Sequence, residues 1–279
     1  MTIIDFILVP LQYDFMVKAI IVSVVVGATL AILSCFLILK GWALLGDAIS
    51  HAVLPGVVLA YVVGIPFGIG AFIAAMIAVI LIGYVKNNTK IKEDAVMGIV
   101  FTTFFALGIV MISKIVSSVD LTHVLFGEVL GISNESAWWT ATILTLVSAA
   151  VLIFRRIFTV FCFDPMHAKV VGLPMTVVHY VFLSLLAIAI TGSIQTVGII
   201  LVIAMLITPG STAFLLTKKF SVMLWIAVVA SVFSSLVGAY ASYHFDVSTG
   251  GTIVLVQGLI FMLVLMYTKL LPETSRENS

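Results

Sequence analysis

The sequence predicts an all-α polytopic membrane protein with about nine transmembrane helices, and three observations carry this prediction. Hydrophobic residues make up 63% of the 279 residues, whereas soluble domains reach about 45–50% even with glycine counted. Charged residues make up only 9%, against about 25% in soluble domains. The apolar runs continue for about 20 residues, which suits membrane-spanning helices, and they do not alternate as the strands of a β-barrel do.

Lysines and Gly/Pro positions separate the first expected spans. Lys40 ends the first apolar run, Gly64 and Pro66 separate the second from the third, and Lys86 ends the third. These four spans are expected at 17–39, 44–63, 67–85 and 95–116.

A semi-polar stretch, 117–135, follows the fourth span, and we expect it to form short helices at the membrane surface. The remaining five spans are expected at 137–160, 175–191, 196–216, 221–243 and 252–270. The break between the sixth and seventh spans is placed at the polar residues 191–193. If those two spans fuse, or if 44–63 crosses only part of the membrane, the count falls to eight.

The distribution of lysine and arginine predicts the orientation. Eleven of the thirteen basic residues fall on one side if the nine spans alternate, and only Lys18 and Lys114 fall on the other. Basic loops stay in the cytoplasm. We therefore expect a cytoplasmic C-terminus and an extracytoplasmic N-terminus. Residues 1–279 form one transmembrane domain, because the loops and the polar tail 271–279 are too short to fold alone.

Several function classes are excluded. The net charge of +1 offers no basic surface for nucleic acid. The two cysteines, Cys35 and Cys162, lie far apart in apolar surroundings and are interpreted as buried packing rather than a disulfide or metal framework. The chain has no GxxxxGK[ST] phosphate-binding loop. If a nucleotide drives this protein, a separate chain must therefore bind it.

Asp47 and His51, in the second span, are the clearest functional candidates. Ionisable residues inside a membrane are costly and mark functional sites. Because they are four residues apart, their side chains share one helix face, with Ser50 beside them. The neighbouring Gly46 and Pro55-Gly56 suggest a broken helix that lines a cavity. A buried pair that merely joins helices is the alternative.

The donor atoms of this pair narrow the cation. Carboxylate oxygen and imidazole nitrogen suit manganese, ferrous iron or zinc, and the absence of cysteine from the stretch around the pair argues against copper(I). Two ligands are few for a divalent ion. A two-fold homodimer would bring two Asp47 and two His51 residues to one axis, and this expectation fails if each subunit has its own path.

The loop 162–174 is expected to contain a short, well-capped helix on the cytoplasmic side. Asp164 is a typical N-cap and Pro165 suits the first helical position. Gly172 suits the position after the last turn, where a left-handed conformation is common. A rigid helix of this kind favours docking to a partner over an ordinary loop.

Two further features are less specific. Asp120, His123 and Glu128, in the outward-facing stretch, could contact an external partner or an arriving ion, and a solvated surface helix explains them equally well. The Gly64–Gly68 pair has the GxxxG spacing that allows close helix packing.

Three sequence stretches resemble the integral-membrane permeases of ABC transporters for manganese, zinc and iron, and the resemblance covers nearly the whole chain. Residues 46–56, GDAISHAVLPG, carry the most specific match. Residues 120–127, DLTHVLFG, match the family's DLxHxLFG stretch, and QTVG at 195–198 followed by AMLITP at 204–209 matches a later pattern. Glu128 departs from the residue that is usual after this stretch, so its role stays open.

The resemblance implies an ABC importer permease fold and a transport subunit rather than an enzyme. It implies a permease homodimer in a bacterial plasma membrane, two cytoplasmic ATPase subunits and an extracytoplasmic metal-binding protein. Asp47 and His51 match the family's intramembrane metal ligands. The segment with Asp164, Pro165, Ala168 and Gly172 matches the coupling loop that docks on the ATPase. No cofactor is expected to be bound permanently, because the ion is cargo. The wording of the motif at 46–56 looks more like the manganese/iron branch than the zinc branch, and manganese is the expected cargo, with iron or zinc as alternatives.

Two rival functions stay open at this point. A proton-coupled secondary transporter would use Asp47 and His51 as a proton relay and would work without an ATPase. An intramembrane metal-dependent enzyme is disfavoured, because the chain has no HExxH motif and no evident general base beside the two ligands.

Overall fold

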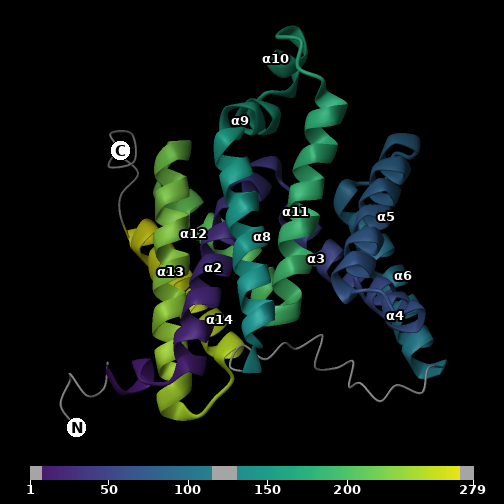
Figure 1. Ribbon diagram of the computed structural model, residues 1–279. Coiled ribbons are helices and arrows are strands. Elements are labelled where there is room, and N and C mark those ends of the chain that lie inside the picture. Colours follow the sequence, from purple (N-terminus) through teal and green to yellow (C-terminus); the bar gives the residue numbers. More distant parts are fainter. Residues whose placement is uncertain (1–7, 115–130, 271–279) are drawn as a thin grey trace.

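A computed structural model describes residues 8–114 and 131–270, and all regular structure within these two stretches is helical (Figure 1). The helices are α2 Asp14–Lys40, α3 Ala43–Ala52, α4 Leu54–Val63, α5 Phe67–Asn88, α6 Glu93–Lys114, α8 Asn134–Ile153, α9 Arg155–Phe163, α10 Pro165–Val170, α11 Met175–Val197, α12 Ile199–Leu216, α13 Phe220–Phe245 and α14 Thr249–Leu270.

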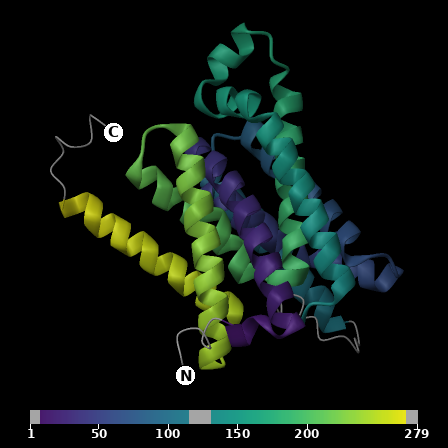
Figure 2. The ribbon, with the colours of Figure 1, turned by 60° about the vertical axis from the view of Figure 1, so that its left-hand side comes forward.

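Nine helical segments of the described residues are long and apolar enough to cross a membrane, with α3 and α4 together forming the second of them. This confirms the larger of the two expected counts. Successive segments alternate in direction, so α9, α10 and the start of α11 lie at one end of the bundle, and α14 runs outwards and towards the same side (Figures 1 and 2). We call this the α10 end.

Helix α2 forms the centre of the bundle and packs against α8, α12 and α13. Near the α10 end, three fully buried phenylalanines contact one another: the ring of Phe36 lies 6.2 Å from that of Phe158 and 6.0 Å from that of Phe182. This cluster joins α2 to α9 and α11. Helix α14 leans away from the bundle in Figure 2 and contacts mainly α12 and α13.

The polarity of the bundle suits a lipid environment. Large apolar side chains such as Ile77, Leu146 and Leu259 are exposed on its outer faces, whereas buried hydroxyls join helices inside. The Thr29 and Ser148 hydroxyls lie 2.7 Å apart between α2 and α8. Small residues and hydroxyls at helix contacts are typical of membrane bundles, because the surrounding lipid is as apolar as leucine.

The expected helix break at 191–193 is wrong. Helix α11 continues to Val197, because the Thr191 hydroxyl donates to the Ala187 carbonyl and the hydroxyl of Ser193 also bonds within the helix. The break falls instead at Gly198, which has φ 79° and ψ 164°, a conformation that is essentially restricted to glycine.

The expected span 137–160 is too long. Helix α8 ends at Ile153, and a new helix, α9, begins at Arg155. Arg155 and Arg156 are adjacent guanidinium groups that cannot remain in hydrocarbon at acceptable cost. The chain therefore changes direction at this point, at the α10 end of the bundle (Figure 1).

The glycine pair chosen for its spacing is not the one that packs closely. Gly64 ends α4 in a left-handed conformation with φ 77°, and no atom lies within 4 Å of the position that a Cβ would take there. The close contact is between Gly56 of α4 and Gly70 of α5, where a Cβ on either glycine would overlap the other's carbonyl oxygen. The spacing motif was uninformative because Gly64 ends α4 and Gly68 lies in α5, so the two glycines do not share a helix face.

Cys162, on α9, is expected to be chemically inert in the folded protein. Burial raises the pKa of its thiol to about 12, so the reactive thiolate is scarce at neutral pH. In a Cys35→Ala variant, maleimide labelling at pH 7.5 should be at least about 100-fold slower in native than in unfolded protein. Mass spectrometry of time points measures both rates, and equal rates would show that the thiol is accessible.

Candidate metal site

A proline places the helix break directly after the candidate ligand pair. Pro55 has no N–H to donate to the carbonyl of His51, four residues earlier, and its ring crowds that carbonyl. Helix α3 accordingly ends at Ala52, and α4 begins at Leu54 with Pro55 in its first turn. Irregular backbone at membrane depth is tolerated where it is covered by protein or lines a cavity. The interruption expected from Pro55-Gly56 is present, and it is confined to Val53, whose backbone stays helical at φ −66° and ψ −27°.

Asp47 and His51 lie together on one face of α3, as their spacing predicts. The His51 Nε2 atom is 3.3 Å from the Asp47 Oδ1 atom. About a quarter of each side chain is exposed, 26% for His51 and 29% for Asp47. The pair is thus supported by the protein behind it and open to an incoming ion, or to a second protein surface, in front.

Two phenylalanines of α6 hold the imidazole of His51. The ring of Phe101 lies 5.3 Å from it, and the ring of Phe105 lies 5.1 Å away at 79°. The Nδ1 atom is buried without a hydrogen-bond partner, whereas metal-binding histidines usually donate this N–H to an oxygen atom that raises their basicity. Aromatic packing therefore orients this ring, and a ligand of moderate strength suits an ion that must leave again.

Ser50 does not belong to the pair, contrary to its expected role beside the ligands. It is fully buried, and its hydroxyl donates to the Gly46 carbonyl at 2.8 Å within the same helix. Gly46 lies against α12, where a Cβ would be 2.8 Å from a methyl carbon of Leu206. The two residues thus belong to the packed face of α3.

The described residues contain no group of three or more histidine, cysteine, aspartate or glutamate side chains that could hold a metal ion. Within this part of one chain, Asp47 and His51 therefore offer only two ligands. Asp120, His123 and Glu128, the expected outer-face contacts, lie outside the described residues.

The helix expected in the loop 162–174 is present as α10, at the far tip of the α10 end (Figure 1). The Met166 N–H donates to the Asp164 Oδ1 atom at 3.1 Å, which is an N-terminal cap. The Leu173 N–H donates to the carbonyl of the fully buried Ala168, and Gly172 has φ 79°. The turn after α10 therefore needs a glycine at position 172.

Apolar side chains on and around α10 are exposed to an unusual degree for a loop away from the bundle. Met166 is 72% exposed, Val170 84% and Val171 61%. Exposed apolar groups gathered at one place mark an interaction surface, and we call these three residues the α10 tip.

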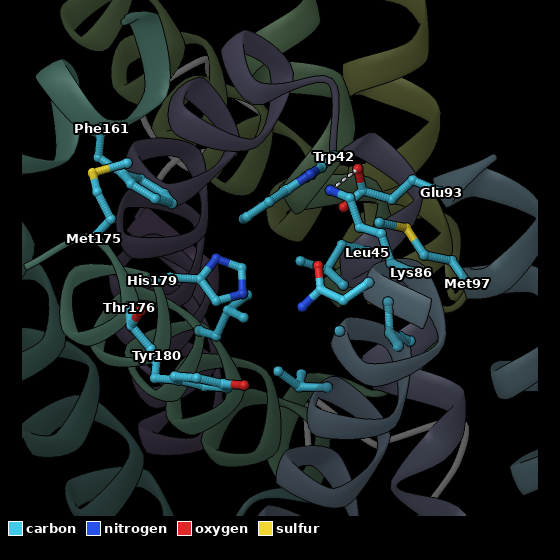
Figure 3. A pocket seen from close by; sticks show the side chains of 15 residues that line it. Trp42, Leu45, Lys86, Glu93, Met97, Phe161, Met175, Thr176, His179 and Tyr180 are labelled. Atoms are coloured by element: carbon cyan, nitrogen blue, oxygen red, sulfur yellow. Dashed lines mark hydrogen bonds and ion pairs between the residues drawn. The ribbon is translucent and has the colours of Figure 1, made fainter. Parts of the chain in front are cut away.

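A cavity of about 450 Å³ at the α10 end was not predicted (Figure 3). His179 and Tyr180 of α11 line one side, and the ion pair of Lys86 with Glu93 lies opposite, with Trp42 between them. These residues come from four separate segments of the chain, so no local pattern could group them. The only sequence signal was the presence of Trp42 and Tyr180 near basic loops.

The cavity and the ligand pair lie on different faces of α3. Trp42 and Leu45 line the cavity, and neither Asp47 nor His51 does. Two residues along a helix correspond to a rotation of about 200°, so Asp47 points away from the face that carries Leu45. One helix thus separates the two sites.

An all-helical bundle with a broken helix, an intramembrane Asp–His pair and a protruding capped helix defines the class of protein as a transport permease that works with a partner. The chain belongs to the ABC 3 transport family, whose model matches residues 12–268. It is therefore the membrane-spanning subunit of an ABC transporter and not the ATPase itself. Family membership also favours ATP-driven transport over the proton-coupled alternative.

Individual relatives agree with this assignment. The chain is 54% identical to the manganese transport system membrane protein MntB of Synechocystis, over 92% of this chain and 84% of that one. It is 48% identical to the chelated iron transport system membrane protein YfeD of Yersinia pestis, over 96% and 90%. Among solved structures, PsaBC from Streptococcus pneumoniae in complex with Fab superposes with a TM-score of 0.83 at 37% identity, covering 95% of both chains.

Proposed function

We propose that this permease imports divalent transition-metal ions, with manganese as the preferred cargo, and that Asp47 and His51 bind the ion during its passage. The observation that carries the proposal is the 3.3 Å Asp47–His51 pair on the open face of a broken intramembrane helix. Its oxygen and nitrogen donors suit manganese and ferrous iron. The manganese and iron transport functions named for the relatives support the same cargo class.

The permease is proposed to act as a two-fold homodimer with the ion between the two copies. Each copy supplies two ligands on a partly exposed face, and a two-fold axis beside this face would assemble a four-ligand site. The open front of the pair is then the surface that the second copy completes.

The α10 end is proposed to face the cytoplasm. The helices place ten of the described basic residues at this end and only Lys18 and Lys114 towards the other, which agrees with the rule for cytoplasmic loops. Two ATPase subunits would dock there, with Asp164, Pro165, Ala168 and Gly172 in the coupling loop. An extracytoplasmic binding protein would deliver the ion to the opposite end, where Asp120, His123 and Glu128 are candidate contacts.

Uptake with competing ions tests this proposal. The permease would be expressed with its ATPase and binding protein in bacterial cells that lack their own manganese importer, and radioactive manganese accumulation would be measured. We expect accumulation to depend on the ATPase. We also expect excess unlabelled manganese to reduce it more than excess iron or zinc does. Iron is the second candidate cargo because of the similarity to the iron permease, and stronger competition by iron would select it.

The α10 tip gives a separate prediction about the ATPase contact. A Val170→Asp substitution places a charge on an apolar docking surface, and we expect it to reduce co-purification of the ATPase at least about tenfold, as an uncompensated charge at an interface does. Val247→Asp, at the opposite end of the bundle, is the control because Val247 is also exposed, at 50%. If both variants retain the ATPase equally, the α10 tip is not the docking surface.

A further inference from the structure

The cavity of Figure 3 continues into a second hollow on the outside of helix α11. This groove has a volume of about 410 Å³ and shares Thr176 and Tyr180 with the cavity. Its other lining residues, Val177, Val181, Ser184 and Leu185, also belong to α11, so the groove is a shallow, open depression on the surface of that one helix. The lining residues recur every four positions along α11, so the groove follows the helix for about 14 Å from the α10 end towards the middle of the membrane.

The cavity itself is polar and aromatic, Lys86 lines it, and a second lysine, Lys40, lies beside it. The Nζ atoms of Lys40 and Lys86 lie on the ring of Trp42, at 5.6 Å and 5.9 Å from its centroid. Lys40 also donates to the Phe161 carbonyl, and Lys86 pairs with Glu93. Of the two lysines, Lys86 lines the cavity and Lys40 does not; Glu93 balances the charge of Lys86, so the net positive charge beside the cavity comes from Lys40. The hydroxyls of Thr176 and Tyr180 stand where the cavity opens into the groove.

The cavity and the groove complement the two parts of a phospholipid, its headgroup and its acyl chain. A phosphate group suits a basic pocket between transmembrane helices at the membrane surface. Tryptophan and tyrosine occupy the headgroup level of a bilayer, which is where Trp42 and Tyr180 would lie. The adjoining groove is apolar, and it faces outwards, because Val177 and Val181 are exposed. A free anion would occupy the cavity but would make no contact with the apolar groove.

We propose that the cavity and the groove together bind one phospholipid with an anionic headgroup, with its phosphate beside Lys86 and Tyr180 and one acyl chain along Val177 and Val181. The site is separate from the ligand pair, which lies on another face of α3. A bound lipid would fill the space between α3, α5 and α11 and support α3 from behind. The metal proposal and the lipid proposal can therefore fail independently.

Native mass spectrometry of the full-length protein, purified in mild detergent, tests the proposal. Phosphatidylglycerol and phosphatidylcholine would be added in turn. We expect wild-type protein to retain phosphatidylglycerol about fivefold better, the factor contributed by one lysine near an anionic lipid surface. Lys86→Gln should remove this preference, whereas Lys90→Gln, which removes the same charge from a neighbouring residue that does not line the cavity, should keep it.

A second pair of variants tests the acyl chain. Val181→Trp fills the groove and should reduce the retention of both lipids at least about fivefold, because a side chain inserted into occupied space typically has an effect of this size or more. Leu255→Trp on the exposed face of α14 is the control. Equal retention of the two lipids by the wild-type protein would overturn the proposal. So would a Val181→Trp variant that binds phosphatidylglycerol as the wild type does and loses it to glycerol phosphate, a result that would identify a free-anion site. Thermal unfolding of each variant confirms that it folds.

Discussion

Asp47→Ala and His51→Ala are each expected to reduce manganese uptake more than tenfold at matched membrane expression. Removing even the groups that orient metal ligands typically costs 10–100-fold in metal affinity or activity, and here each variant removes one of two ligands per chain. If the homodimer shares the ion, a single substitution removes two of four ligands. The measurement is initial uptake of radioactive manganese in cells that carry the complete transporter.

Ser50→Ala is the matched control for these variants. Ser50 lies between the two candidate ligands in sequence, but its hydroxyl is bonded to the Gly46 carbonyl and is buried. We therefore expect near wild-type uptake. Normal uptake in both Asp47→Ala and His51→Ala would make the pair structural, and the ion path would then have to be sought at Asp120, His123 and Glu128.

Among the substitutions proposed for this protein, Gly56→Ala is expected to reduce the stability of the fold most. A Cβ on Gly56 would overlap the Gly70 carbonyl oxygen and would lie 2.6 Å from the Cβ of Ala74. Backbone atoms cannot retreat as a flexible side chain can, so α4 and α5 must separate. Overpacking of this kind costs about 1–3 kcal/mol or more, and we expect the apparent Tm in detergent to fall by about 5 °C.

Gly83→Ala, on the same helix as Gly70, provides the comparison. Its Cβ would meet no atom within 4 Å, and alanine favours helix by about 1 kcal/mol over glycine. Its apparent Tm should therefore stay level or rise. Size-exclusion chromatography after heating measures both variants, and an equal Tm for Gly56→Ala and Gly83→Ala would contradict the close approach of α4 and α5.

The Gly56 contact also connects stability with function. Gly56 lies one residue after Pro55, which ends the helix that carries Asp47 and His51. Helix α5, which Gly56 touches through Gly70, continues to Lys86 at the cavity of Figure 3. Separating α4 from α5 should therefore disturb the break behind the ligand pair, and Gly56→Ala is expected to lower uptake by the protein that still folds.

Local sequence patterns determined most of the secondary structure. Runs of about 20 apolar residues predicted nine membrane segments, since a helix must satisfy its own backbone in lipid. The four-residue spacing of Asp47 and His51 predicted that they share a helix face, and Asp164 and Gly172 predicted both ends of α10. Each of these features depends on one short, continuous stretch of the chain, so the sequence alone was enough to predict it.

The predictions that failed depended on the surroundings of a residue. Thr191 and Ser193 were expected to interrupt a helix, but their hydroxyls bond to carbonyls of the preceding turn. Ser50 was placed beside the ligands by spacing, yet it faces the packed side of α3. A polar residue can bond locally or reach a neighbour, and the packing of the chain selects between the two.

The sequence by itself therefore determined the class of membrane protein, the presence of its apolar segments, the shared helix face of Asp47 and His51 and the capped helix α10. Only the tertiary structure decided that Phe101 and Phe105 hold His51, that Gly56 meets Gly70, and that Trp42, Lys86, His179 and Tyr180 surround one cavity. The physical reason is that these contacts join helices far apart in the chain. Their formation depends on how whole helix faces fit together, which no short sequence pattern specifies.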